Sequence, residues 1–216
     1  RFRHRDGSWR LIEAIGQPPA ADAGLDGFVF NARDVTERVS AEQRTQVLLD
    51  VARDLGQTLD ADALIARVQE QIRRVVPCDG VATFRRDAAD GVFRLAAHTG
   101  LPEPLLGTWA ALEMPQGAFT GRHLDAGTLM VNDVSSFPWT RSVSDPGARV
   151  RAIMAAPLHV RGRHVLTMVA LRARDERAFG ENDRAMLTGI NEQLSLALER
   201  VELHRVEREE AAIAAS

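Results

Sequence analysis

The sequence predicts an α+β fold in which helices pack on an antiparallel sheet. Apolar residues recur at spacings of three and four in the stretches 41–59, 64–76 and 187–201, which is the period of an amphipathic helix. Between them, residues 150–160 and 164–171 are almost continuously apolar and are separated by a short turn. Such runs are typical of strands with both faces covered, so we expect a hairpin at the centre of the sheet.

Composition bounds the class of protein. The chain has 216 residues and 45% of them are hydrophobic, which is enough for a sizeable core. The net charge is −3, and basic and acidic residues are mixed along the chain. We therefore expect no nucleic-acid partner and no contact with a membrane surface. No apolar run approaches the roughly 20 residues of a membrane-spanning helix.

The single cysteine, Cys78, excludes an internal disulfide and a multi-cysteine zinc site. It fits a reducing compartment, and we expect the cytoplasm. The sequence contains no lysine, which removes that residue as a Schiff-base nucleophile. It begins with Arg1 instead of Met, so we interpret it as a piece of a longer protein.

The first elements are strands that lead into a helix. Residues 1–5 and 9–15 are expected to form a hairpin around Asp6-Gly7, and residues 27–33 a third strand. Asp34 follows, and its side chain is expected to cap the next helix by accepting from the backbone N–H of Thr36 or Glu37.

This segment resembles the end of a PAS domain. The residues that carry the resemblance are Arg-His-Arg-Asp-Gly-Ser-Trp-Arg at 3–10 and Gly-Phe-Val-Phe-Asn-Ala-Arg-Asp-Val-Thr-Glu-Arg at 27–38. They match the last three strands of such a domain and its Asp-x-Thr exit into a signalling helix. The resemblance implies a PAS remnant at 1–38 and a signalling helix at 39–58. The PAS segments that would enclose a ligand are not in this stretch.

After Asp60 a second amphipathic helix runs to Pro77, which stops it. Residues 134–147 are polar but contain Phe137 and Trp139, so this loop is expected to fold over an apolar surface. The remaining expected elements are strands at 81–85 and 92–98, an irregular stretch at 100–113, a short helix at 116–125, a strand at 128–131, the central hairpin, and a long helix from about 181 to at least 210.

The chain from about 43 to 208 resembles a GAF domain. Besides the order of elements, the matching residues are Gly121, Gly127, Asp133, Ala156-Pro157-Leu158, Arg161-Gly162-Arg163, Phe179 and Asp183. The resemblance implies an antiparallel sheet with the terminal helices on one face and a loop-roofed small-molecule pocket on the other. It assigns 59–198 to the GAF domain and 199–216 to an output helix. Thr167 stands where such domains usually have a glycine.

Catalysis has little support in these residues. Cys78 has no second cysteine to resolve it, unlike the free methionine sulfoxide reductases that use a GAF fold. Among the residues that bind cyclic nucleotides in the phosphodiesterase relatives, only Phe179 and Asp183 are present. His159 and His164 flank the hairpin turn without a carboxylate in register, so they are expected to face solvent and not to bind a metal. No catalytic residue, metal site or particular cofactor is predicted.

An apolar pocket for a small effector remains, since methionine and aromatic side chains adapt to apolar or planar ligands. A plain core of the same composition is the alternative. His123 could ligate a haem or contact an effector, or it could be an ordinary, partly exposed helix histidine, and Arg151 could contact an anionic group. The candidate lining residues are Phe84, Met114, Phe119, His123, Met130, Trp139, Arg151 and Met154.

The helical stretches also predict a partner. The apolar seam of the first long helix, with a second stripe at Val47 and Val51, would allow contact with its own domain and with another copy of the chain. One wide face packed on a single domain is the alternative. We expect a parallel homodimer, which suits a sensor that passes its state to an output domain. A dimerisation spacer without a ligand is the second hypothesis. The candidate seam residues are Ala41, Thr45, Leu48, Ala52, Leu55, Leu203 and Val206.

Overall fold

The structure is a computed structural model that describes residues 1–5, 7, 9–17, 28–114, 127–136, 150–174 and 177–214. The chain divides into two compact units, Arg1–Val47 and Leu48–Ser216, and each is described by itself. The division falls within the helix α1 (Thr36–Leu55).

The first unit consists of two antiparallel strand pairs and the start of α1. β1 (Phe2–Arg3) pairs with β2 (Trp9–Arg10), and β3 (Ile12–Gln17) pairs with β4 (Val29–Asp34). The strand predicted at 9–15 is thus two strands that meet at Leu11. The backbone of Leu11 leaves the ladder there, because its N–H donates to Thr36 Oγ1 (2.8 Å) and its carbonyl accepts from Val35 N–H (2.9 Å).

The predicted cap at the start of α1 is confirmed. Asp34 Oδ1 accepts from both the backbone N–H (2.9 Å) and the hydroxyl (2.6 Å) of Thr36. The Thr36 hydroxyl oxygen in turn accepts from Leu11, so one threonine joins the strand pair to the helix. These bonds and the desolvation that opposes them leave the pKa of Asp34 below its usual value.

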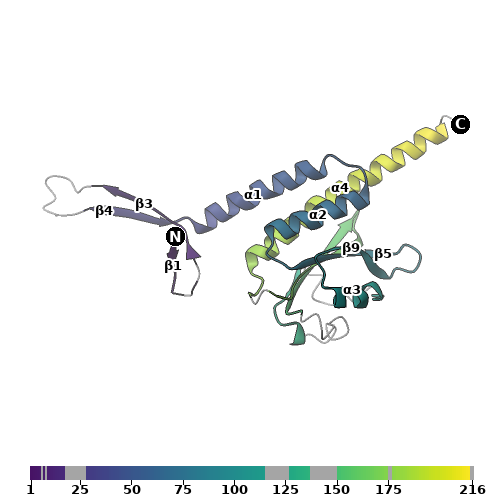
Figure 1. Cartoon of the computed structure of the whole chain (residues 1–216). Helices are drawn as coiled ribbons and strands as arrows, with labels where there is room; N and C mark the ends of the chain where they lie inside the picture. The colour runs from purple at the N-terminus through teal and green to yellow at the C-terminus, as the bar shows by residue number, and fades with distance from the viewer. Residues whose placement is uncertain are drawn as a thin grey trace. The chain divides into compact units, whose positions relative to one another are not determined.

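The second unit is a five-stranded antiparallel sheet with helices on both faces, which confirms the α+β prediction (Figure 1). The strand order is β6-β5-β9-β8-β7. The elements are α2 (Ala61–Val75), β5 (Gly80–Arg86), β6 (Phe93–Thr99), α3 (Glu103–Ala110), β7 (Leu129–Val131), a 3₁₀ turn (Val134–Ser136), β8 (Ala152–Val160), β9 (Arg163–Arg172) and α4 (Glu181–Ala214).

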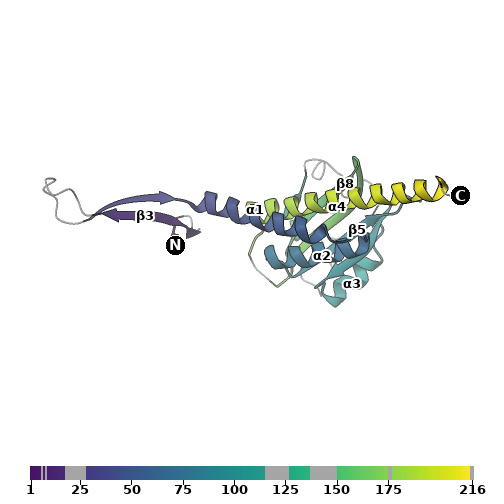
Figure 2. The ribbon, with the colours of Figure 1, turned by 90° about the horizontal axis from the view of Figure 1, so that it is seen from above.

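Two helices, α2 and α4, cover one face of the sheet (Figures 1 and 2). Their buried side chains fall at the predicted helical spacing, and a buried hydrogen bond from Gln69 to Thr83 (2.8 Å) ties α2 to β5. The last two turns of α1 join this layer, since Arg200 on α4 donates to the carbonyl of Leu55 (2.7 Å). The buried residues of α2 and α4 are Leu64, Ile65, Val68, Gln69, Ile72, Met186, Leu187, Gly189, Ile190, Asn191, Leu194 and Ala197.

On the opposite face lies α3, in a stretch that was expected to be irregular. Its two prolines, Pro102 and Pro104, stand at the start of the helix, where the missing N–H groups would have no partner anyway. The prolines were therefore compatible with a helix, and Leu105 and Trp109, four residues apart, form its buried side.

β7 pairs only with residues 153–155 of β8, and side chains of α4 bind the backbone that follows on the same edge. Asn191 donates to the Pro157 carbonyl (2.8 Å), Ser195 to the His159 carbonyl, and Glu199 accepts from the Arg161 N–H (3.0 Å). Four residues of helix rise about 6 Å and two residues of strand about 6.6 Å, so the two series stay in step. We call these three bonds the edge ladder.

In the part of the chain that the structure describes, no helix has the length and apolar composition required to cross a bilayer.

Candidate functional site

The face of the sheet under α3 carries one apolar cluster, the candidate effector face. Phe84 of β5 packs against Trp109 of α3 with ring centroids 5.6 Å apart. Phe93 of β6 exchanges two backbone hydrogen bonds with Met114, which places that methionine over the same face. The buried members are Ala82, Phe84, Phe93, Leu105, Trp109, Met114, Val131, Val134, Ile153, Ala155, Val169 and Leu171.

The structure brings together only part of the expected pocket lining. Phe84 and Met114 lie in this cluster. Met130 and Met154 do not, because neighbouring strand residues point to opposite faces and it is Val131, Ile153 and Ala155 that face the cluster. Met130 and Met154 pair with each other on the helix-bearing face, which corrects that expectation.

Arg151 lies elsewhere. It is exposed and lines a separate cavity of about 300 Å³ together with Asp133, Ser135 and Arg177. Phe119, His123 and Trp139 lie outside the described residues.

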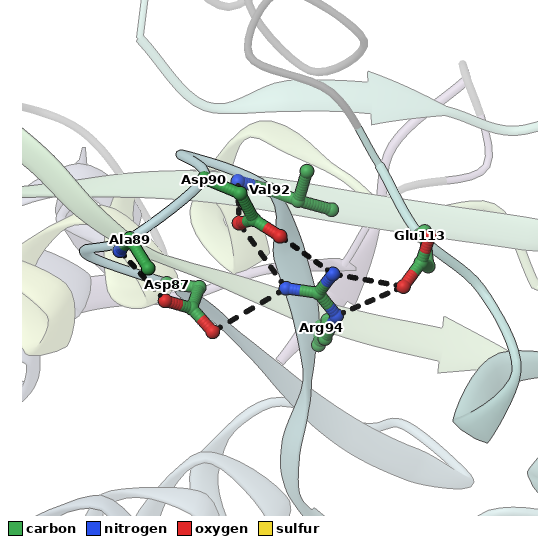
Figure 3. A network of polar contacts seen from close by, with 6 residues as sticks. All are labelled: Asp87, Ala89, Asp90, Val92, Arg94 and Glu113. Atoms are coloured by element: carbon green, nitrogen blue, oxygen red, sulfur yellow. Dashed lines mark hydrogen bonds and ion pairs between the residues drawn. The ribbon is translucent and has the colours of Figure 1, made fainter.

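An arginine at the margin of the cluster organises the loops beside it (Figure 3). Arg94 of β6 binds Asp90 (2.7 Å), Asp87 (3.4 Å) and Glu113 (2.8 Å). The bonds to Asp90 and Glu113 hold the pKa of Arg94 above its ordinary value, and those from Arg94 and Val92 keep the pKa of Asp90 low. The arginine therefore fixes the β5–β6 loop and the residue before Met114.

At one end of the cluster a polar chain fills the space beside the hairpin. His164 Nε2 lies 2.8 Å from the Thr167 hydroxyl oxygen. The centroid of the His164 ring lies 4.6 Å from that of Phe93 and 5.2 Å from that of His159. Thr167 is fully buried. The threonine that replaces the expected glycine thus holds a half-buried histidine, and of the two histidines expected to face solvent only His159 is exposed.

Burial is the main reason that the pKa of His164 is lowered, with His159 the next cause.

A buried arginine that sequence reasoning missed locks the start of α4. Arg172 donates to the carbonyls of Pro77 (2.6 Å), Arg177 (2.9 Å) and Ala178 (2.7 Å), and pairs with Asp183 (3.2 Å). Its guanidinium carbon lies 4.0 Å over the ring of Phe179. Phe179 and Asp183, two of the residues that carried the GAF resemblance, therefore have a structural role. A lone arginine at the end of an apolar run was the available signal.

Asn132, the residue after β7, completes this lock. The side-chain amide of Asn132 donates to the Phe179 carbonyl (3.0 Å) and accepts from the Phe179 N–H (2.7 Å). The end of β7 and the start of α4 are therefore held together by both edges of one amide.

Cys78 has the environment of a structural thiol. Burial raises its pKa from 9.0 to about 11, against the opposing effect of Arg73 and Arg172. A thiol with so high a pKa carries little thiolate near neutral pH, so it is a poor nucleophile.

The expected dimer seam lies only partly on the surface. Leu55 is 1% exposed, and Leu48 packs so close to α4 that a Cβ added at Gly189 would come within 2.8 Å of it. Both leucines therefore contact their own domain, which corrects that part of the seam. Ala41, Thr45 and Leu203 are exposed, and Ala52 and Val206 are half-buried.

Solved structures resemble this arrangement at low sequence identity. A GAF domain/HD domain protein from Geobacter sulfurreducens is 20% identical, with a TM-score of 0.56, covering 69% of this chain and 98% of that one. Free methionine-R-sulfoxide reductase from Neisseria meningitidis is 19% identical, with a TM-score of 0.61 and coverage of 74% and 91%. The PixJ GAF domain of Thermosynechococcus elongatus in its blue-light-absorbing form is 19% identical, with a TM-score of 0.55 and coverage of 72% and 94%.

Among curated proteins, none matches the chain. The family model of the GAF domain matches residues 58–199, which is most of the chain. With the sheet order, the helices on both faces and this match together, the chain belongs to the GAF domain family.

Proposed function

We propose that the chain is a regulatory sensor segment of a signal-transduction protein, and that α4 relays the state of the GAF domain to an output domain outside this sequence. The observation that carries the proposal is the length of α4. Its last buried residue is Ala197, but the helix continues to Ala214. A helix that continues beyond its own core needs a partner to stay ordered, and a signalling helix has one in a second copy.

The occupant of that exposed stretch is proposed to be the same stretch of a second chain. Leu196, Leu203 and Ile213 are 60%, 51% and 75% exposed, and spacings of seven and ten keep them along one side of the helix. With Val206 they form the revised seam. A parallel homodimer would place the two copies of α4 side by side and in register.

The effector is proposed to bind on the α3-covered face, beside Phe84 and Met114. Aromatic and methionine side chains accept apolar ligands there, and the Arg94 network holds the chain that leads to Met114. A ligand biases the relay only by the difference in its affinity for two arrangements of the helices.

The alternative is a dimerisation spacer without a ligand. Full burial of Thr167 and the packing of His164 on Phe93 favour it, because they fill one end of the candidate effector face. A screen of metabolites and nucleotides that never raises the melting temperature would support the spacer over the sensor.

The first 38 residues are proposed to be the last strands of a PAS domain, and the protein is proposed to work in the cytoplasm. The Asp34–Thr36–Leu11 bonds support the first statement, since they join a strand pair directly to a helix. The single cysteine supports the second.

The double substitution Leu196→Glu and Leu203→Glu tests the dimer seam on which the relay depends. It places four carboxylates per dimer in the seam, which should lower the dimer association constant at least tenfold, a loss of about 1.4 kcal/mol. Light scattering over a concentration series measures it. Because both leucines are exposed, the melting temperature of the domain should change little.

Ala211→Glu, on the exposed C-terminal part of the same helix but outside the seam, is the matched control and should leave the dimer intact. An unchanged mass for the double leucine variant would refute the seam, whatever the outcome for the effector.

A further inference from the structure

A cavity of about 490 Å³ lies on the helix-bearing face, at the end of the sheet where β8 turns into β9. It is separate from the candidate effector face, which lies under α3 on the other side of the sheet. Residues of α2, α4 and both hairpin strands line its apolar part, namely Ile65, Val160, Val165, Leu166, Leu198 and Val201. Its volume suits one small organic molecule.

Four arginines contribute to the lining: Arg85, Arg86, Arg161 and Arg163. The one lining carboxylate, Glu202, is already bound by Arg205 (3.0 Å), which lies outside the lining. Arg85 is likewise occupied, because it pairs with Asp62. The cavity therefore has an excess of positive charge beside an apolar wall.

The guanidinium groups of Arg161 and Arg163 supply most of that excess. Within the described ranges, neither forms an ion pair with a carboxylate. Glu202 lies nearby, and its pKa is lowered chiefly by the hydrogen bond from Arg205 and to a smaller extent by Arg161. Both arginines are exposed at the hairpin turn. Two guanidinium groups that line one cavity without an ion pair to a described carboxylate suit the oxygens of a phosphate or a carboxylate.

The backbone of Arg161 has a conformation that is unusual for arginine. Its φ is 51°, and it is the one non-glycine residue with positive φ among the described residues. The first position of such a two-residue turn favours asparagine, aspartate or glycine, so arginine is there at a conformational cost. The Glu199 carboxylate accepts from the Arg161 N–H (3.0 Å) and holds the turn against α4. The side chain is thus kept at the rim of the cavity by a fixed backbone.

We propose that this cavity binds a small amphipathic organic anion. The apolar body would lie on Ile65, Leu198 and Val201, and the anionic group would lie between Arg161 and Arg163. Such a ligand would touch α4 close to the point where the helix leaves the sheet, which gives the domain a second input that does not depend on the α3-covered face.

Calorimetric titration of the whole chain with 1-naphthyl phosphate tests this, with 1-naphthol as the matched neutral molecule. We expect saturable binding of one phosphate ester per chain, at least about tenfold tighter than that of naphthol and weakened by added salt. Equal affinity for the two molecules, or no heat from the ester up to about 1 mM, would overturn the proposal.

The double variant R161N/R163Q removes both charges. Asparagine suits the left-handed turn, so the fold should be at least as stable, and affinity for the ester should fall at least about tenfold. The control R53Q/R74Q also removes two exposed arginine charges, far along the sequence from the turn, and should bind normally. Equal binding by both double variants would overturn the proposal.

The location is tested by Val201→Glu. A carboxylate on the half-buried wall of the cavity should abolish binding of the ester, while the melting temperature reports whether the domain is still folded. Undiminished binding by a folded V201E variant would place the ligand elsewhere and refute this site.

Discussion

His164 shows how one residue couples the sheet to pH. Its ring is held between the Thr167 hydroxyl, Phe93 and His159, and this half-buried position on an aromatic face makes a charged ring costly. Arg86 adds a further unfavourable charge. The neutral form is therefore the one that fits the folded state.

The sign of the pH effect follows from this lowered pKa. Above the ordinary histidine value of 6.5 the ring is neutral in both states, and its contribution to stability is complete. As the pH falls below 6.5, the unfolded chain takes up the proton first, and stability is lost until the folded pKa is passed. We predict that His164→Gln reduces the loss of unfolding free energy between pH 7.5 and pH 5.5, measured by urea titration.

His98→Gln, which removes an exposed imidazole from β6, is the control for that measurement. A pH dependence that is the same in H164Q and in the unsubstituted chain would show that the polar chain at Thr167 does not titrate with folding.

At the scale of elements, the edge ladder explains why α4 and β8 stay in register. A strand edge with open carbonyls invites pairing with another chain, and here side chains of a helix occupy it. Sequence reasoning recognised the strand and the helix by their periods but could not match them, because the polar residues of α4 carry no signal for a partner so distant in sequence.

We predict that Asn191→Ala costs about 1 to 2 kcal/mol of unfolding free energy. Asn191 is only 5% exposed, and the substitution leaves the Pro157 carbonyl without its hydrogen-bond donor. Equilibrium unfolding in urea measures the loss. Glu192→Ala, the adjacent and exposed position, should change stability by less than about 0.5 kcal/mol. Equal effects at the two positions would mean that the ladder contributes no stability.

The sequence predicted the strands but not which of their residues lie on which face of the sheet. Continuous apolar runs predicted β8 and β9, but a run that is apolar on both faces does not say which residue faces which layer. Met154 was therefore expected on the α3-covered face but lies on the opposite one, whereas Phe84 lies on the α3-covered face. Leu48 and Leu55 had the spacing of a coiled-coil seam, and that spacing also serves to pack a helix on its own domain.

At the scale of the whole chain, the order of elements was the strongest predictor. No single residue in the second half identified the fold, but helix, strand pair, hairpin and long helix in that order agreed with the sheet that is observed. The buried lock at Arg172 could not be predicted. Its longest bond reaches the carbonyl of Pro77, 95 residues away in the sequence, while the same side chain also binds the loop before α4 and Asp183.

The two units differ in what holds them together, which leads to a last prediction. The second unit has a core on both faces of its sheet, whereas the first unit presents large apolar side chains to solvent: Phe2, Trp9, Ile15, Phe28 and Phe30 are 63–69% exposed. Isolated strand pairs are marginally stable in water. Removal of residues 1–33, which keeps the Asp34 cap, should therefore shift the melting temperature by less than about 2 °C.

Native-state hydrogen exchange on the full chain should agree. Amides of β3 and β4 should exchange through local opening, and those of β5, β8 and β9 only through global unfolding, because the latter strands lie in the packed sheet. A drop of more than about 5 °C on truncation, or equal protection of both sets of strands, would mean that the first unit contributes to the stability of the second. The apolar side chains of the first unit would then have their cover within this chain, and their exposure would no longer support a missing part of a PAS domain.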